Sequence, residues 1–334
     1  MWIALLVLLM WPTAELGAEP LGALELPIDC EPGVDCWILR YVDHDPGPGA
    51  RDYACGKLTG DGHKGTDFAL ADFAVMADGV EVRAAAAGIV DALRDGMPDV
   101  GLDQGAEAVA DKTCGNGIRL DHGGGWTTWY CHLRRGSLMV RKGDRVAAGQ
   151  PLGLVGYSGE TTFPHLHFDV RHEGQAVDPF APDQGAEDCG VGDRPLWSAQ
   201  ALRLLDYLAP VVTSIGVATA RPESTDVRRG WHRSGRLSAT SPALVVFADI
   251  NWLDADDRIG FRLRGPGGEV VVERVVTMER SWPRWFGFAG TPRPQEGWPS
   301  GRYVAELSLE RPPDAARVLA ERVIEVAPGQ AMSQ

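Results

Sequence analysis

The sequence predicts an all-β protein, with a compact antiparallel sheet followed by a smaller domain of the β-sandwich type. Between about residues 61 and 180, short apolar runs such as "VEVRAAAAGIVDAL" and "GDRVAAGQPLGLVG" alternate with glycine-containing turns. This spacing is typical of antiparallel strands. From "PVVTSIGVATA" onward come further alternating runs, among them "ALVVFADINWL" and "RYVAELSLE", and these predict the second β-domain.

The chain begins with an apolar run from Trp2 to about Trp11 in "MWIALLVLLMWPTAELGAEP". The run is too short to span a bilayer and fits the apolar part of a secretion signal. We therefore expect a signal peptide over residues 1–18, cleaved after Ala18, with Ala14 as the second choice. Because no Lys or Arg precedes the run, retention as an anchor is the alternative. No other stretch is long and apolar enough to span a bilayer, which predicts an exported protein with no transmembrane segment in the mature chain.

The cysteines agree with export. Residues 19–60 are rich in Pro, Gly and Cys and predict a lead-in pinned by disulfides. The chain has six cysteines, an even number with no CxxC pair, which favours disulfides over a structural zinc cluster. The run "GIRLDHGGGWTTWY" predicts two strands around a glycine-rich turn, which brings Cys114 close to Cys131. The other pairs then follow by elimination: Cys30 with Cys36, and Cys55 with Cys189.

The charge distribution supports a boundary near residue 200. Residues 1–200 carry 15 basic and 30 acidic residues, a net charge of −15, whereas residues 201–334 carry 17 and 16, a net charge of +1. We expect the first β-domain at 61–195, with an acidic, glycine-rich insertion near 92–113, and the second at 200–334. No basic stripe is present to neutralise phosphates, which argues against nucleic acid or an anionic membrane as a partner.

Polar clusters occur in three separate segments of the first domain. In "TTFPHLHFDV" the alternation predicts a strand on which His165 and His167 project to the same face. The segment "GHKGTDFAL" holds His63 and Asp67, four residues apart, at a bend that leads into a strand. The segment "WYCHL" places His132 at the end of a hairpin strand. Singly these are ordinary loop or strand residues; together they favour a shared site.

The residue types fit a catalytic zinc site. Such a site uses three protein ligands and keeps the fourth position for water. Two histidines and one aspartate would make that set, and two further histidines would remain for acid–base work. The spacing alone leaves open which histidines bind the metal.

The order of the motifs resembles the M23 or LytM-type peptidases, the lysostaphin-like zinc enzymes that cleave peptidoglycan. The resemblance covers about residues 61–180 and rests on "HKGTD", "GNGIRLDHGGGWTTWYCHL", "GYSGETTFPHLHFDVR" and "VDP". It implies a compact antiparallel sheet with a groove across it and one zinc ion per chain. The residues that it implies as zinc ligands are His63, Asp67 and His167. The pair that it implies as acting on the water and stabilising the transition state is His132 and His165.

One departure from the family pattern is Phe163, which stands where a glycine is usual. We expect its side chain to narrow the rim of the groove. The C-terminal residues 200–334 match no family that we can name, and their role as a wall-binding, partner-binding or stabilising module is open.

The resemblance implies a zinc-dependent endopeptidase that hydrolyses peptide bonds in the stem-peptide cross-links of peptidoglycan, in the periplasm or cell envelope. The alternative is a catalytically inactive regulator of the LytM type, which binds and activates a cell-wall amidase. All five motif positions hold the expected residue types, which favours the enzyme. A carrier barrel of the lipoyl type is disfavoured because no lysine stands at the tip of the "GDRVAAGQPLGLVG" hairpin.

Overall fold

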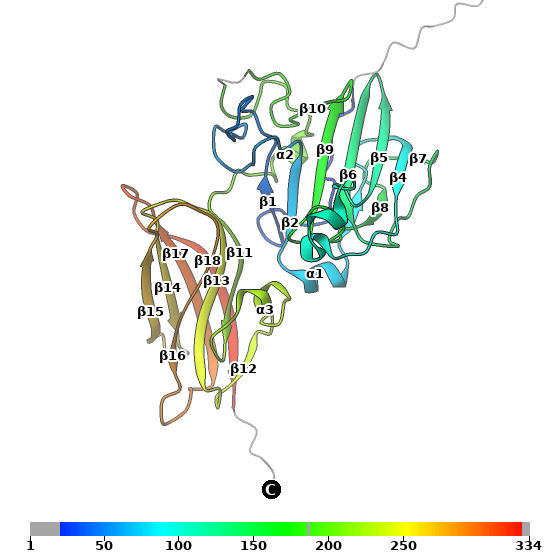
Figure 1. Cartoon of the computed structure of the whole chain (residues 1–334). Coiled ribbons are helices and arrows are strands. Elements are labelled where there is room, and N and C mark those ends of the chain that lie inside the picture. The colour runs from blue at the N-terminus through cyan, green and yellow to red at the C-terminus, as the bar shows by residue number, and fades with distance from the viewer. Residues whose placement is uncertain (1–20, 186–187, 329–334) are drawn as a thin grey trace, which may run out of the picture.

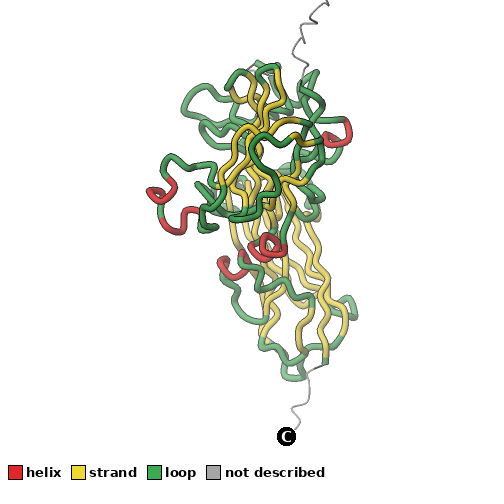
Figure 2. The backbone as a smooth tube through the Cα atoms, turned by 90° about the vertical axis from the view of Figure 1, so that its right-hand side faces the viewer, coloured by secondary structure: helices red, strands yellow, loops and turns green. Residues whose placement is uncertain are grey.

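The computed structural model describes residues 21–185 and 188–328 of the chain. The predicted signal peptide lies outside these residues. Figure 1 shows two β-rich parts, and each has its own hydrophobic core. We call them the N-terminal domain, with core residues from Leu24 to Leu205, and the C-terminal domain, with core residues from Val217 to Val326. Strands fill both domains and the helices are short segments at their edges (Figure 2), so the predicted all-β class is confirmed.

The N-terminal domain is built on an eight-stranded sheet in the order β1-β2-β9-β6-β5-β4-β7, with β10 paired to β9. All of its pairings are antiparallel. Its strands are β1 (Cys36–Arg40), β2 (Thr66–Leu70), β4 (Gly88–Arg94), β5 (Asn116–Gly123), β6 (Trp126–Leu133), β7 (Arg145–Val146), β9 (His165–His172) and β10 (Gln175–Val177). A separate two-stranded sheet pairs β3 (Glu81–Arg83) with β8 (Pro151–Leu154).

Side-chain alternation gives the large sheet one core face and one open face. In β9, Leu166 and Phe168 are fully buried, whereas His165 and His167, which alternate with them, are partly exposed, because successive strand residues point to opposite sides. Tyr130 of β6 faces the same core as Phe168, with 5.3 Å between the ring centroids. The polar residues of β9 are thereby left on the open face of the sheet.

The lead-in, residues 19–60, is more than the loop-dominated segment that its composition predicted. It contains strand β1, which pairs with β2 and forms an edge of the large sheet. Two of its tyrosines, Tyr41 and Tyr53, are buried and pack against Phe180 at 5.3 and 4.7 Å between ring centroids. These aromatic contacts make the lead-in part of the core of the N-terminal domain.

All six cysteines are paired. The disulfides are Cys30–Cys36, Cys55–Cys189 and Cys114–Cys131, the same pairs that the sequence favoured. The second disulfide ties the lead-in to the segment that follows β10. The third joins Cys114, two positions before β5, to Cys131 of β6, next to His132.

The C-terminal domain is a sandwich of two sheets. One has the order β11-β13-β16 and the other the order β12-β18-β17-β14-β15. The first sheet consists of β11 (Val211–Ala218), β13 (Ala243–Leu253) and β16 (Trp282–Pro292). The second consists of β12 (Arg236–Ser238), β14 (Arg258–Arg264), β15 (Val270–Thr277), β17 (Gly301–Glu310) and β18 (Arg317–Ala327). Pairing is antiparallel except between β12 and β18.

Buried side chains from both sheets interdigitate between them, among them Val246 of β13 and Leu307 of β17. The helices lie outside these sheets: α1 (Phe73–Asp78), α2 (Ala199–Leu202) and α3 (Ser224–Arg228), with two 3₁₀ turns, Gly101–Gln104 and Ala106–Val109, in the insertion. No helix among the described residues is both long and apolar enough to cross a membrane.

The two domains contact each other along the edge of the large sheet that carries β1 and β2. Trp252 of β13 donates a hydrogen bond from Nε1 to the backbone carbonyl of Leu39 at 2.8 Å and packs against the N-terminal core. Lys57 pairs with Asp254 across the same boundary. Figure 1 shows α3 on the side of the C-terminal domain that faces α1. The C-terminal domain therefore lies beside the β1–β2 edge of the large sheet.

Candidate active site

The first part of the site is formed where the chain enters β2. His63 precedes this strand and Asp67 is its second residue, and Nε2 of His63 lies 3.2 Å from Oδ2 of Asp67. The other ring nitrogen, Nδ1, lies 2.7 Å from the backbone carbonyl oxygen of Tyr41. Because a carbonyl can only accept, the network assigns the proton of His63 to Nδ1. Nε2 then has a free lone pair on the side of Asp67.

Strand β9 brings the second part of the site next to the first. His167 is the register partner of Asp67, and its Nδ1 lies 2.8 Å from Oδ1 of that aspartate. His165, two residues earlier on the same face, has its Nε2 3.5 Å from the same oxygen. Close approach of the strands needs Gly65, since a Cβ there would lie 2.5 Å from the carbonyl oxygen of Phe168 and 2.8 Å from ring atoms of His167.

His132 reaches the site by a break in strand alternation. Trp129 and Cys131 of β6 line the groove, whereas Tyr130 lies in the core. Strict alternation would send His132 into the core beside Tyr130. Instead, His132 has a φ of 63° and the β5–β6 register shifts at this point. This irregularity turns the side chain toward the groove, as β-bulges do near functional sites.

Backbone carbonyls fix the rings of His132 and His165. Nδ1 of His132 lies 2.8 Å from the carbonyl oxygen of Ser158, and Nδ1 of His165 lies 2.9 Å from that of Phe163. By the same reasoning as for His63, both rings carry their proton on Nδ1 and present an unprotonated Nε2. The two ring centroids are 4.6 Å apart. The arrangement directs two proton-accepting nitrogens to one region of the groove.

The backbone at Gly115 packs closely against the Ser158 carbonyl that orients His132. Gly115 has a φ of +65°, and a Cβ at this position would lie 2.4 Å from the carbonyl oxygen of Ser158. The backbone N–H of His132 donates to the carbonyl of Cys114 at 2.8 Å, and Cys114 is bonded to Cys131. The third disulfide thus joins the segment that supports His132 to the strand that carries it.

The electrostatics of the site favour an ionised Asp67 and the neutral forms of His132 and His165, whereas Asp67 raises the pKa of His63 against the effect of burial. Asp67 is only 7% exposed. Burial by itself would raise its pKa, but the neighbouring His63 and His165 and the hydrogen bond from His167 hold the pKa of Asp67 well below its usual range. Burial lowers the pKa of His132, and the nearby His165 and His167 lower it further. Burial also lowers the pKa of His165.

The donor set fits a zinc ion. One ligand atom from each of His63, Asp67 and His167 can be chosen so that all lie within 4.8 Å of one another. Ligands of a tetrahedral zinc, each about 2.0–2.1 Å from the metal, lie roughly 3.3 Å apart, close to the 3.2 Å between Nε2 of His63 and Oδ2 of Asp67. The carbonyl of Tyr41 on the second nitrogen of His63 is the kind of support that metal-binding histidines have.

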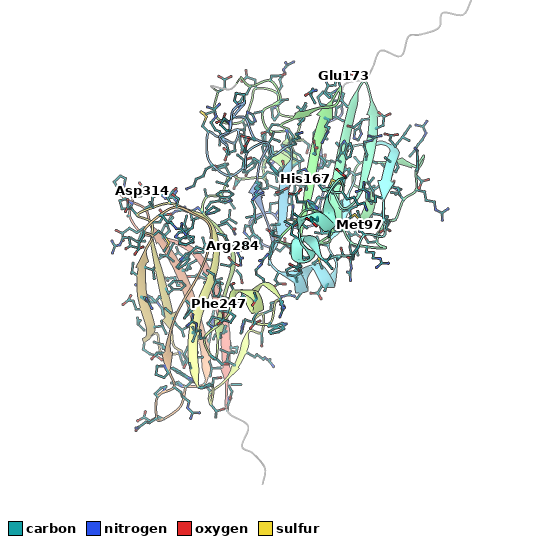
Figure 3. The ribbon with its side chains drawn as sticks, in the orientation of Figure 1. Met97, His167, Glu173, Phe247, Arg284 and Asp314 are labelled. Carbon is teal, nitrogen blue, oxygen red and sulfur yellow. A yellow bond between two sulfur atoms is a disulfide. The ribbon has the colours of Figure 1, made fainter. Side chains whose placement is uncertain are left out.

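The site opens into a groove of about 910 Å³. All five predicted site residues line it, together with Phe163 on its rim. The sequence did not indicate that the C-terminal domain provides a second wall. The groove-lining residues of that domain are Thr213, Arg228, Asp249, Asn251, Trp252, Pro283 and Arg284. Figure 3 labels His167 in the N-terminal domain and Arg284 in the C-terminal domain, and both line this groove.

A groove across an antiparallel sheet thus contains a donor set that could hold a metal ion, beside two further imidazoles. Residues 61–179 match the profile of Peptidase family M23, which confirms the family resemblance that the motifs indicate for this segment.

Two curated relatives illustrate the range of the family. The chain is 32% identical to the "Peptidoglycan DD-endopeptidase ShyA" of Vibrio cholerae over 115 residues, 34% of this chain and 21% of that protein. It is 36% identical to the "Murein hydrolase activator EnvC" of Escherichia coli over 94 residues, 28% of this chain and 22% of that protein. The matched segments thus span about a fifth of the relatives' length.

Among solved structures, the chain is similar to the catalytic domain of the prophage-encoded M23 protein EnpA from Enterococcus faecalis. The similarity has a TM-score of 0.30 and 26% identity, and it covers 44% of this chain and 90% of that chain.

Proposed function

We propose that the protein is a zinc-dependent endopeptidase that hydrolyses peptide bonds in the stem-peptide cross-links of peptidoglycan. The observation that carries the proposal is the cluster of His63, Asp67 and His167, with donor atoms within 4.8 Å of one another, beside two further imidazoles in one groove. The similarity to a peptidoglycan endopeptidase supports the choice of substrate. We propose in addition that the protein is exported and acts in the periplasm or cell envelope.

In this proposal His63, Asp67 and His167 hold one zinc ion per chain. When bound there, zinc supplies Lewis acidity that polarises a peptide carbonyl and makes a water molecule more acidic. The ionised state of Asp67 suits this role, because its negative charge partly neutralises a bound cation.

His132 and His165 are the proposed acid–base pair. Each ring is held at Nδ1 by a backbone carbonyl and has its Nε2 available to accept a proton from the attacking water. Once protonated, the same nitrogen can donate to the developing oxyanion or to the departing amine. Burial of both rings favours the neutral form at the start of the reaction, which is the form that a general base needs.

The test is digestion of purified sacculi with the mature protein, followed by mass spectrometry of the released muropeptides. We expect cleavage of cross-linked peptides that stops in the presence of a chelator and returns with zinc. The matched variant is Asp67→Asn, which keeps the shape of the side chain and removes its charge. Intact sacculi with zinc-loaded wild type would contradict the proposal.

A regulator that activates an amidase is the second candidate, because of the similarity to a murein hydrolase activator. The same experiment separates the two functions. A regulator would leave sacculi intact alone but would accelerate their digestion by an added amidase, and Asp67→Asn would not change that acceleration.

A further inference from the structure

The second wall of the groove carries charged groups that the proposed hydrolysis does not use. Arg228 ends helix α3, Asp249 lies in β13 and Arg284 lies in β16. All three line the same groove as the histidines. Two cations and one anion give this part of the wall an excess positive charge.

The pairing within the wall leaves one cation without a partner. Arg284 donates from Nε to both carboxylate oxygens of Asp249, at 2.9 and 3.2 Å, and also pairs with it through Nη2. Asp249 is 4% exposed, so this carboxylate is already committed to Arg284. The two charges neutralise one another, and the excess charge belongs to Arg228.

Arg228 is held beside Thr162 and Phe163 but has no direct ion-pair partner among the described residues. It donates from Nη2 to the backbone carbonyl of Thr162, and its guanidinium lies over the ring of Phe163, with Cζ 4.7 Å from the centroid. Its buried Nε has no hydrogen-bond partner, and no carboxylate among the described residues forms an ion pair with it. Burial and the neighbouring charge of Arg284 lower the pKa of Arg228 more than the nearby Asp249 and Asp103 raise it.

A partly buried cation without a counter-ion is unfavourable, and an arginine in this situation is well suited to bind an anion. Its planar fork of N–H donors matches a carboxylate in geometry, and an ion pair formed in a desolvated groove is stronger than one in open solvent. Peptide substrates carry carboxylates on side chains and at chain ends. Phe163, which Arg228 covers, is two residues from His165, so an anion bound here would lie close to the reacting bond.

We propose that Arg228 is a specificity-determining residue that binds a carboxylate of the peptide substrate. The inference rests on the proposed function, and it gives the C-terminal domain a role in recognising the substrate. Phe163 supports this role in place of the usual glycine, because its ring positions the guanidinium at the rim.

The experiment uses the full-length mature protein and a set of cross-linked peptides in which each carboxylate in turn is replaced by a carboxamide. For one of these positions we expect the amide to lower kcat/KM of the wild type by roughly 10- to 100-fold, the usual worth of a hydrogen bond to a charged group. In Arg228→Gln the difference between the two peptides should disappear, because kcat/KM for the carboxylate peptide should fall to the value for its carboxamide analogue. Arg228→Lys should retain part of it.

The matched control is Arg229→Gln. Arg229 is the next residue, is exposed, lies over Trp231 with Cζ 5.2 Å from the ring centroid and does not line the groove. We expect it to keep the full discrimination of the wild type. An equal loss on all peptides in Arg228→Gln would mean that Arg228 only supports the loop of Thr162, and would overturn the inference. So would a wild type that cleaves all peptides equally.

Failure of the proposed function has a different outcome. A wild type that cleaves no peptide and leaves sacculi intact would overturn the hydrolase, and binding of the same peptides by calorimetry would then decide on Arg228. Weaker binding of one amide, lost in Arg228→Gln, would support the carboxylate site. Equal binding of all peptides would overturn it.

Discussion

Replacing Gly65 by alanine tests whether the close packing of β2 against β9 determines the geometry of the proposed zinc site. An added Cβ would lie 2.5 Å from the carbonyl oxygen of Phe168 and 2.8 Å from Cε1 and Nε2 of His167, whereas real Cβ contacts essentially never fall below 3.0 Å. The obstacle is backbone rather than the end of a flexible side chain. The strands must therefore separate by about 0.5 Å, or the ring of His167 must rotate away.

The geometry of a zinc site does not tolerate such a shift. Metal–ligand distances hold to within about 0.2 Å, and a misplacement of about 1 Å can cost roughly 100-fold in rate. We expect Gly65→Ala to weaken zinc binding at least tenfold and to lower kcat/KM by about 10- to 100-fold. The overpacking itself should cost about 1–3 kcal/mol of folding free energy.

The assay combines zinc titration against a competing chelator, cleavage of a cross-linked peptide and urea unfolding. Gly60→Ala is the control, because Gly60 lies in the same loop and a Cβ there meets no atom within 4 Å. It should behave like the wild type in all three measurements. Wild-type zinc affinity in Gly65→Ala would refute the packing argument, and an equal loss in both variants would show that the loop is sensitive to any substitution.

Three further predictions concern the histidines, the third disulfide and the domain boundary. His165→Ala should keep its zinc and lose about 10²–10⁴ in rate, whereas His167→Ala should lose both; metal analysis that gives the opposite pattern would reverse the two roles. Replacing the disulfide Cys114–Cys131, which closes a separation of 17 residues, by two serines should cost about 3 kcal/mol in urea unfolding, and an unchanged midpoint would contradict this. Trp252→Ala should loosen the domains and enlarge the radius of gyration in small-angle scattering, with zinc content unchanged; identical scattering curves would show that the Trp252 contacts do not hold the domains together.

The fold class could be predicted from the sequence because its signals are local. Alternating apolar residues and glycine turns predict strands, and alternation alone places His165 and His167 of β9 on one face of the sheet. The integration of the lead-in into the sheet could not be predicted in this way. Strand β1 is a short segment within a region rich in proline and glycine, and its place depends on pairing with β2 and on aromatic contacts with Phe180, which are distant in sequence.

The orientation of the His132 side chain could not be predicted from the sequence either. Regular alternation would direct it into the core, and only the positive φ and the shifted register of β6 turn it to the groove. The motif identified the residue type, whereas the backbone irregularity determined where the ring points. The second wall of the groove escaped prediction for a related reason, because Arg228 and Arg284 come from segments that carry no recognisable motif and meet the site only through the contact between domains.

The orientation of the imidazoles depends on main-chain atoms, which a sequence pattern cannot reveal. Each of three histidine rings is held at Nδ1 by a backbone carbonyl: His63 by that of Tyr41, His132 by that of Ser158 and His165 by that of Phe163. A carbonyl is present in every residue, so the side chains at these positions are free to change while the ring orientation is kept. The glycines that allow the close backbone approaches have no such freedom, since any Cβ would displace the carbonyl or the ring it meets. Constraint in this site therefore falls on the histidines, on Asp67 and on the two close-approach glycines, Gly65 and Gly115, while the side chain of Phe163, which does not hold a ring, provides a surface for Arg228.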